Sequence, residues 1–222
     1  MALKITQNPL FHDSSRAVDL VKLSSPAVLR RSRGNHKREL RDQRRTATAV
    51  EAIAGLDHQT EIYGFTKGQF SLLHLIQAVF MTTGPAHLTL STWTAAAHEI
   101  ESLSAMRARG DITGLRLLID FSMARREPAM TAQMREKLGR DNIRVAQTHS
   151  KFAVFQNPDW KVVLRTSMNL NMNPRNEDYL LGHDPELAAF LNKILDEVWA
   201  RQKSDMQEAA PYEIIQHWQK DL

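Results

Sequence analysis

From about residue 58 onward, the sequence alternates between short apolar runs of strand length and longer segments with helical periodicity. Residues 70–80 are almost continuously apolar and are followed by Gly84-Pro85, which indicates a buried helix and its end. Residues 115–121 form a short apolar run of the kind that buried parallel strands show. Strands and helices that alternate in this way feed one sheet with helices on its faces. We therefore expect an α/β domain with a layered mixed sheet flanked by helices.

The same pattern predicts the individual elements of this domain. The predicted strands cover residues 61–65, 87–92, 115–121, 142–147, 151–156, 160–167 and 179–182. The predicted helices cover residues 70–80, 94–109, 128–138 and 185–201. Asn157-Pro158-Asp159 is a typical turn sequence and separates two of the strands.

The first 50 residues carry most of the positive charge. They hold eleven lysines and arginines against four acidic residues, whereas the whole chain has a net charge of +4. A patch of this density favours a phosphate-rich partner such as nucleic acid or an acidic membrane surface, and the alternative is a solvated tail. The residues that we expect to contact nucleic acid are Arg30, Arg31, Arg33, Lys37, Arg38, Arg41, Arg44 and Arg45.

These patterns divide the chain into three parts. Residues 1–57 are expected to form a basic N-terminal arm with two helices, a short one over 17–23 and a basic one over 35–54. Residues 58–203 are expected to form the α/β domain, and residues 204–222 a C-terminal helical tail.

Several features that the sequence lacks exclude whole classes of protein. No run of about 18 apolar residues is present, and the first ten residues show no basic stretch before an apolar core, so we expect no membrane partner and no secretory signal. The absence of cysteine excludes disulfides, thiolate metal sites and cysteine nucleophiles. The histidines show no short ligand spacing, so we expect no metal and no cofactor. A cytoplasmic protein is the expectation that fits these features.

Polar residues gather where two neighbouring predicted strands meet their loops. His149 and Lys151 lie at the head of one apolar strand, and Ser167 and Asn169 lie at the end of the next. Glu177 follows in the loop after them. The ends of strands in α/β sheets are frequent ligand sites, so we expect these polar residues to lie at a ligand site.

In these residues the sequence resembles the phospholipase D superfamily. His149 and Lys151 match the His-x-Lys part of that family's motif. Ser167 and Asn169 match its Ser-x-Asn element, and Glu177 falls where the family has a glutamate. The resemblance implies a phospholipase D-like catalytic domain with phosphodiesterase activity.

The resemblance covers roughly residues 58–203, and two motif positions depart from the family's pattern. Gln156 stands where the family has an aspartate, and Thr166 where it has a glycine. With the basic arm, the resemblance implies a nuclease that acts on DNA or RNA. One alternative is a catalytically silent nucleic-acid-binding protein on the same fold, with Gln156 as a mark of decay. Another is a lipid phosphodiesterase, for which no amphipathic membrane helix is evident.

The mechanism that the resemblance implies agrees with the chemistry of phosphodiesters. A neutral imidazole can attack phosphorus and hold a phosphoryl group covalently, which is the role implied for His149. Lys151, Asn169 and Ser167 would then stabilise charge on the non-bridging oxygens. Glu177 would fix the tautomer of His149 through the other ring nitrogen.

The chain contains one such motif, whereas members of the family place two around one active site. The resemblance therefore implies a homodimer in which a two-fold axis supplies both the attacking imidazole and the acid that protonates the leaving group. Outside the motif, we interpret Asp120 as a structural cap and Trp93 as a packing residue.

Overall fold

The computed structural model describes residues 37–42 and 47–202 of the 222-residue chain. Several expectations concern other residues and lie outside the described ones. They are the helix over 17–23, the helical tail over 204–222, and the basic residues Arg30, Arg31, Arg33, Arg44 and Arg45.

One sheet of eight strands forms the centre of the described structure, in the order β1-β2-β8-β7-β6-β3-β4-β5. Strands β3, β4 and β5 are parallel to one another, and β1 is parallel to β2. The pairs β2–β8, β8–β7, β7–β6 and β6–β3 are antiparallel, so the sheet is mixed, as expected. The strands are β1 (Lys37–Asp42), β2 (Thr60–Thr66), β3 (Ala86–Thr92), β4 (Ile112–Asp120), β5 (Ile143–Ala146), β6 (Phe152–Gln156), β7 (Lys161–Thr166) and β8 (Glu177–His183).

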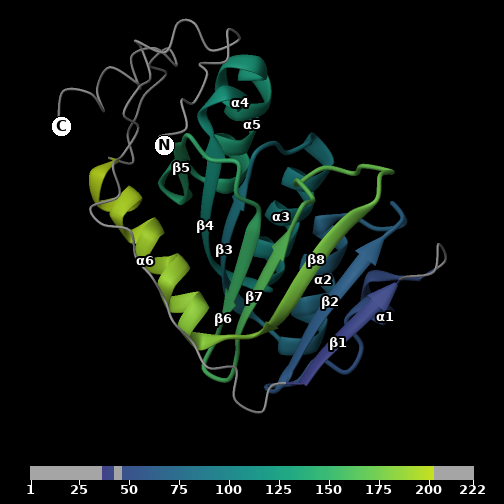
Figure 1. Ribbon diagram of the computed structural model, residues 1–222. Helices are drawn as coiled ribbons and strands as arrows, with labels where there is room; N and C mark the ends of the chain where they lie inside the picture. Colours follow the sequence, from purple (N-terminus) through teal and green to yellow (C-terminus); the bar gives the residue numbers. More distant parts are fainter. Residues whose placement is uncertain (1–36, 43–46, 203–222) are drawn as a thin grey trace, which may run out of the picture.

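Helices cover both faces of the sheet, which makes the domain a three-layer α/β structure (Figure 1). Helices α2, α3 and α5 lie on one face, and α6 crosses the other. The helices are α1 (Ala49–Ala52), α2 (Leu72–Thr83), α3 (Ala97–Arg109), α4 (Phe121–Arg126), α5 (Pro128–Leu138) and α6 (Pro185–Arg201), with a 3-10 turn η3 (Arg140–Asn142) before β5.

The two faces carry apolar cores of different extent. The larger core lies under α2, α3 and α5 and contains fully buried side chains such as Leu75 and Leu90. On the opposite face, Leu195 of α6 packs near Val154 and Val163 of the sheet in a smaller cluster. Among the described residues, α6 is the one helix on this second face, and a groove lies beside it.

The sequence signals at helix ends agree with the structure. Helices α5 and α6 begin at Pro128 and Pro185, and both have the bounds that the sequence predicts. The Asp184 side chain caps α6 by accepting a hydrogen bond from the backbone N–H of Leu187. The other strands and helices predicted after residue 58 are present, with ends that differ by up to three residues.

The prediction of a basic helix over residues 35–54 is wrong. Residues Lys37–Asp42 form the edge strand β1, which pairs with β2 in parallel register, and of the described residues in this range only Ala49–Ala52 are helical. Ala52 and Ile53 are buried in the larger core, so this segment belongs to the folded domain. A short basic stretch has no strong period of its own, and pairing with β2 decides its conformation.

Helix α4 was missed by the sequence analysis, which extended the preceding strand to Phe121. The strand ends at Asp120, whose side chain accepts a hydrogen bond from the backbone N–H of Ser122 and so caps α4. The interpretation of Asp120 as a structural cap is therefore confirmed. An Asp two residues before a Ser at a strand end was the available signal for this helix start.

Candidate active site

One edge of the sheet brings the five predicted catalytic residues together. Strands β3, β4, β5 and β7 end at this edge, and β6 and β8 begin there. The segment 147–151 precedes β6, and the segment 167–176 connects β7 to β8. His149 and Lys151 lie in the first segment, and Ser167 and Asn169 in the second.

Hydrogen bonds from two neighbouring strands hold the loop that carries His149. The Oδ2 of Asp120, at the end of β4, accepts a hydrogen bond of 3.0 Å from the backbone N–H of Thr148. The Ser91 hydroxyl on β3 donates to the Ser150 carbonyl at 3.0 Å. Since both Asp120 and Ser91 are buried, the backbone on each side of His149 is fixed to the sheet while its imidazole is exposed.

The closest polar neighbour of the His149 imidazole is the Lys151 ammonium. Lys151 Nζ lies 3.2 Å from Nδ1 and 3.4 Å from Nε2 of His149, and it donates to the His149 carbonyl at 3.0 Å. Burial lowers the pKa of Lys151, and the nearby Glu177 carboxylate opposes that shift.

The Glu177 carboxylate is hydrogen-bonded by side chains of the loop that precedes β8 and not by His149. Its carboxylate accepts hydrogen bonds from the Ser167 hydroxyl and, at 3.3 Å, from the Asn173 side-chain amide. Within the described residues, no hydrogen bond joins Glu177 to the His149 ring. The structure therefore does not show the tautomer-fixing contact that the resemblance implies, and Glu177 acts on Lys151 through its charge.

Asn169 carries an unsatisfied polar atom at this edge. Its Oδ1 is buried and has no hydrogen-bond partner among the described residues. The adjacent backbone is fixed, because Leu170 N–H donates to the Thr92 hydroxyl at 3.1 Å and the Leu170 carbonyl accepts from Ala96 N–H at 3.0 Å. A buried amide without a partner is costly to a fold and is frequently found where a ligand binds.

Two residues that the sequence analysis did not assign to the site lie next to it. The Trp93 ring centroid is 5.6 Å from that of His149, and Arg126 packs its guanidinium group over the Trp93 ring. Trp93 follows β3 and so lies at the same edge of the sheet as the motif. Its position directly after a predicted strand was the only sequence signal for this role.

A groove of about 1090 Å³ extends from the candidate site along the α6 face of the sheet. His149, Lys151 and Ser167 line one part of it, and apolar residues of α6 such as Phe190 and Ile194 line another. The site is therefore open to a molecule larger than a single phosphate group.

The three predicted nucleic-acid contacts that the structure describes have partners within the domain. Lys37 forms an ion pair with Glu39, and Arg38 pairs with Glu61. Arg41 binds Glu39 and the carbonyl oxygens of Ala52 and Ala54, so it supports the end of α1. Lys37, Arg38 and Arg41 therefore lie on the edge strand of the folded domain and not on a separate helical arm, and their contact with nucleic acid stays a prediction.

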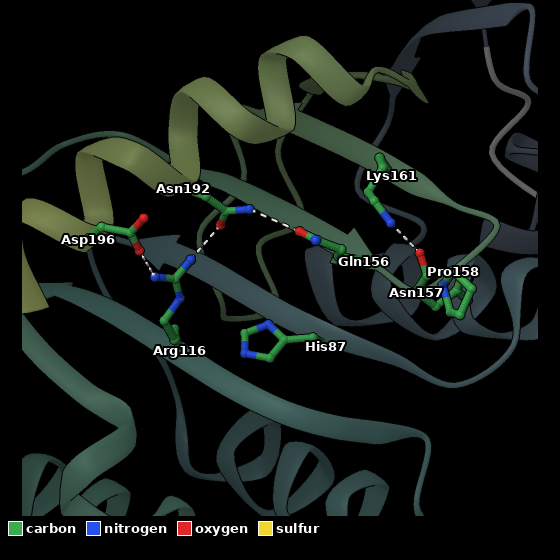
Figure 2. A pocket seen from close by; sticks show the side chains of 8 residues that line it. All are labelled: His87, Arg116, Gln156, Asn157, Pro158, Lys161, Asn192 and Asp196. Carbon is green, nitrogen blue, oxygen red and sulfur yellow. Dashed lines mark hydrogen bonds and ion pairs between the residues drawn. The ribbon is translucent and has the colours of Figure 1, made fainter.

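Figure 2 shows Gln156, at the position of the family's aspartate, where it ends β6. His149 lies before the start of that strand. Gln156 is five residues beyond Lys151, the last residue of the His149 loop, or roughly 16 Å at the rise of a strand. Asn192 on α6 donates to Gln156 Oε1 at 3.1 Å and accepts from Arg116 at 2.6 Å. Arg116 also pairs with Asp196 at 2.5 Å, so Gln156 belongs to a network that joins α6 to the sheet.

No group of three or more acidic or histidine side chains in residues 37–42 and 47–202 is arranged to hold a metal ion. None of the helices in this part of the chain has the length and apolar character needed to cross a bilayer.

No protein-family model and no curated protein matches the chain. Similar solved structures include polyphosphate kinase from Porphyromonas gingivalis, with 13% identity and a TM-score of 0.48 over 64% of this chain and 26% of that one. Phosphatidylserine synthase from Haemophilus influenzae Rd KW20 has 13% identity and a TM-score of 0.44 over 72% of this chain and 44% of that one. The match thus spans only about a quarter of the kinase and less than half of the synthase.

The structure of Nuc from Salmonella typhimurium is also similar, with 15% identity and a TM-score of 0.44 over 64% of this chain and 95% of that one. Nuc is described as a phospholipase D family member, which is the family that this sequence resembles.

Proposed function

We propose that this protein is a metal-independent phosphodiesterase of the nuclease type, with His149 as its nucleophile. The observation that carries the proposal is the His149 loop. Its backbone is fixed by Asp120 and Ser91, its imidazole is exposed, and its ring nitrogens face the Lys151 ammonium. A rigidly held, accessible imidazole beside a positive charge suits attack on an anionic phosphodiester.

The proposed reaction has two steps. In the first, a ring nitrogen of His149 forms a bond to phosphorus while the bond from phosphorus to the leaving oxygen breaks, and an acid protonates that oxygen. In the second, water attacks phosphorus, the bond to His149 breaks, and the acid is reprotonated by the water. Lys151 and the side-chain amide of Asn169 stabilise the charge on the non-bridging oxygens, which is why the chemistry requires no metal ion.

A second copy of the chain supplies the acid in this proposal. No other described histidine contacts His149, and its exposed ring is accessible to a partner's His149 across a two-fold axis. Light scattering of the full chain should give about twice the monomer mass of 25.3 kDa. A monomer that retains full turnover would contradict the shared site and leave His149 without its acid.

The function is tested by incubating the pure full-length protein in EDTA with four labelled substrates: single-stranded DNA, single-stranded RNA, duplex DNA and phosphatidylcholine vesicles. His149→Ala removes the proposed nucleophile, and His87→Ala is the matched control, because His87 lies at the start of β3, away from the site. We expect nucleic acid to be cleaved by the wild type and the His87→Ala variant only. Binding without cleavage would support the silent binding protein, and cleavage of the vesicles alone would support a lipid phosphodiesterase.

A further inference from the structure

Trp93 and Arg126 form a stacked pair at the side of the His149 imidazole. Trp93 is half-buried, and its ring lies at 60° to that of His149 with 5.6 Å between their centroids. The loop that carries Trp93 is fixed, because the Thr92 hydroxyl donates to the Thr94 carbonyl at 2.7 Å and Ala95 pairs with Leu170 as a parallel bridge. The indole is therefore a rigid wall of the candidate site.

Arg126 is held in place but keeps its terminal nitrogens available. Its guanidinium carbon lies 4.1 Å from the Trp93 ring centroid, and its Nε donates to the Ser122 carbonyl at 3.3 Å. The side chain is exposed, and Nη1 and Nη2 have no hydrogen-bond or ion-pair partner among the described residues. A guanidinium stacked on an aromatic face is pre-organised to bind an anion with two parallel hydrogen bonds.

The other arginines stacked on an aromatic ring in the described structure differ from Arg126 in this respect. Arg116 and Arg144 both lie over the Trp199 ring, at 5.6 Å and 5.0 Å. Arg116 pairs with Asp196 and Asn192, and Arg144 donates to three backbone carbonyl oxygens. Those two stacks fasten α6 to the sheet. The two terminal nitrogens of Arg126 have no acceptor among the described residues, which points to an external one.

We propose that Trp93 and Arg126 form a subsite for a phosphate group of the substrate next to the one that is cleaved, an inference that rests on the proposed function. The Trp93 ring centroid is 4.1 Å from the guanidinium carbon of Arg126 and 5.6 Å from the ring centroid of His149. The guanidinium carbon is therefore within about 10 Å of the imidazole. Nucleic acid rises about 3.4 Å per nucleotide along a stacked strand. Arg126 is thus within reach of a phosphate next to the cleaved bond.

The position of Arg126 favours some phosphodiester substrates over others. A polynucleotide carries phosphates on both sides of the cleaved bond, whereas a diester with a single phosphorus offers Arg126 nothing to bind. The subsite therefore favours a substrate with repeated phosphates. Trp93 contributes by holding the guanidinium flat, which keeps the orientation of both terminal nitrogens fixed.

The test compares Arg126→Ala and Trp93→Ala with Arg140→Ala. Arg140 is an exposed arginine in η3, before β5, and its removal changes the net charge equally. Each variant is assayed in EDTA with a labelled 20-nucleotide single strand and with bis(p-nitrophenyl) phosphate, a diester with one phosphorus. We expect Arg126→Ala to raise KM for the oligonucleotide about ten-fold over Arg140→Ala, the scale of losing a charged hydrogen bond. The corresponding ratio for the small diester should be clearly smaller.

A binding measurement separates failure of the subsite from failure of the proposed function. In the His149→Ala background, anisotropy titrations of the same labelled strand at several salt concentrations should show weaker binding when Arg126→Ala is added. The slope of log K against log salt should flatten by about 0.7, the value for one phosphate contact on a single strand. Trp93→Ala should weaken binding with a smaller change in slope, because the charge remains. Equal affinities and slopes for the Arg126→Ala and Arg140→Ala proteins would overturn the subsite, whether or not the wild type cleaves its substrate.

Discussion

Strand β6 joins two polar clusters that differ in how their hydrogen bonds are satisfied. At its start, the exposed His149 ring has only Lys151 as a polar neighbour, and nearby Asn169 has a buried oxygen without a partner in the described residues. At its end, Gln156 is bound by Asn192, which in turn binds Arg116. The first cluster leaves polar groups for a ligand, and the second uses them to fix α6 on the sheet.

The difference between the clusters explains why a change in the family's motif need not silence the site. The substituted position, Gln156, lies in the cluster that binds α6, roughly 16 Å along the strand from the His149 loop. Asp196 supplies a carboxylate to Arg116 in that cluster. Gln156 is itself hydrogen-bonded to Asn192, and the His149 loop has its own supports in Asp120 and Ser91.

The two clusters should differ most in the loss of kcat when one lysine of each is replaced by alanine. Lys151→Ala should lower kcat about 100-fold or more, the scale of losing one preorganised group that stabilises the transition state. Asn169→Ala should have an effect of similar size. Lys161→Ala is the matched control, since Lys161 lies at the start of β7 in the opposite cluster and binds the Asn157 carbonyl. Steady-state turnover of labelled oligonucleotide measures all three, and equal losses for the two lysines would remove the distinction.

A smaller effect is expected when the charge of Glu177 is removed. Lys151 must be protonated to act, and burial already lowers its pKa, so activity should fall with rising pH below the range of an ordinary lysine. Glu177 opposes this shift. Glu177→Gln should therefore lower the pKa of Lys151 further and move the alkaline limb of the pH–rate profile to lower pH, with a smaller loss of kcat than Lys151→Ala causes. An unmoved alkaline limb would show that Lys151 does not control it.

The smallest effect on activity is expected at Gln156. An aspartate there can still accept the hydrogen bond from Asn192, so Gln156→Asp should change kcat less than about two-fold and the free energy of unfolding by about 1 kcal/mol at most. Urea unfolding and turnover of the same two preparations give both numbers. A large gain of activity would instead identify the natural protein as a silenced enzyme.

Much of the fold was predictable because its local signals agree with its tertiary structure. The bounds of α5 and α6 follow from proline at their starts, and an apolar run identifies β4. Strand β1 could not be predicted, because it is a basic edge strand whose pairing with β2 depends on contacts far along the chain. Periodicity and capping residues can be recognised in the local sequence, whereas the pairing of an edge strand depends on residues that are distant in the chain.

The candidate site was predictable only in part, for a similar reason. The motif residues His149 and Lys151 were found by resemblance, and the structure places them side by side. Arg126 was not found, because it lies on α4 and reaches Trp93 only through the fold. The partners of Glu177 also could not be foreseen, since they depend on the conformation of the loop between β7 and β8.

The most direct test of the central claim is to locate the covalent intermediate. Wild-type protein is mixed with excess oligonucleotide in EDTA, quenched at alkaline pH to preserve phosphoramidate bonds, digested, and analysed by mass spectrometry. We expect a nucleotidyl adduct on the peptide that contains His149 and none on the peptide that contains His87, the histidine of the opposite cluster. Cleaved substrate with no adduct on His149, or with an adduct on another residue, would contradict the assignment of His149 as the nucleophile.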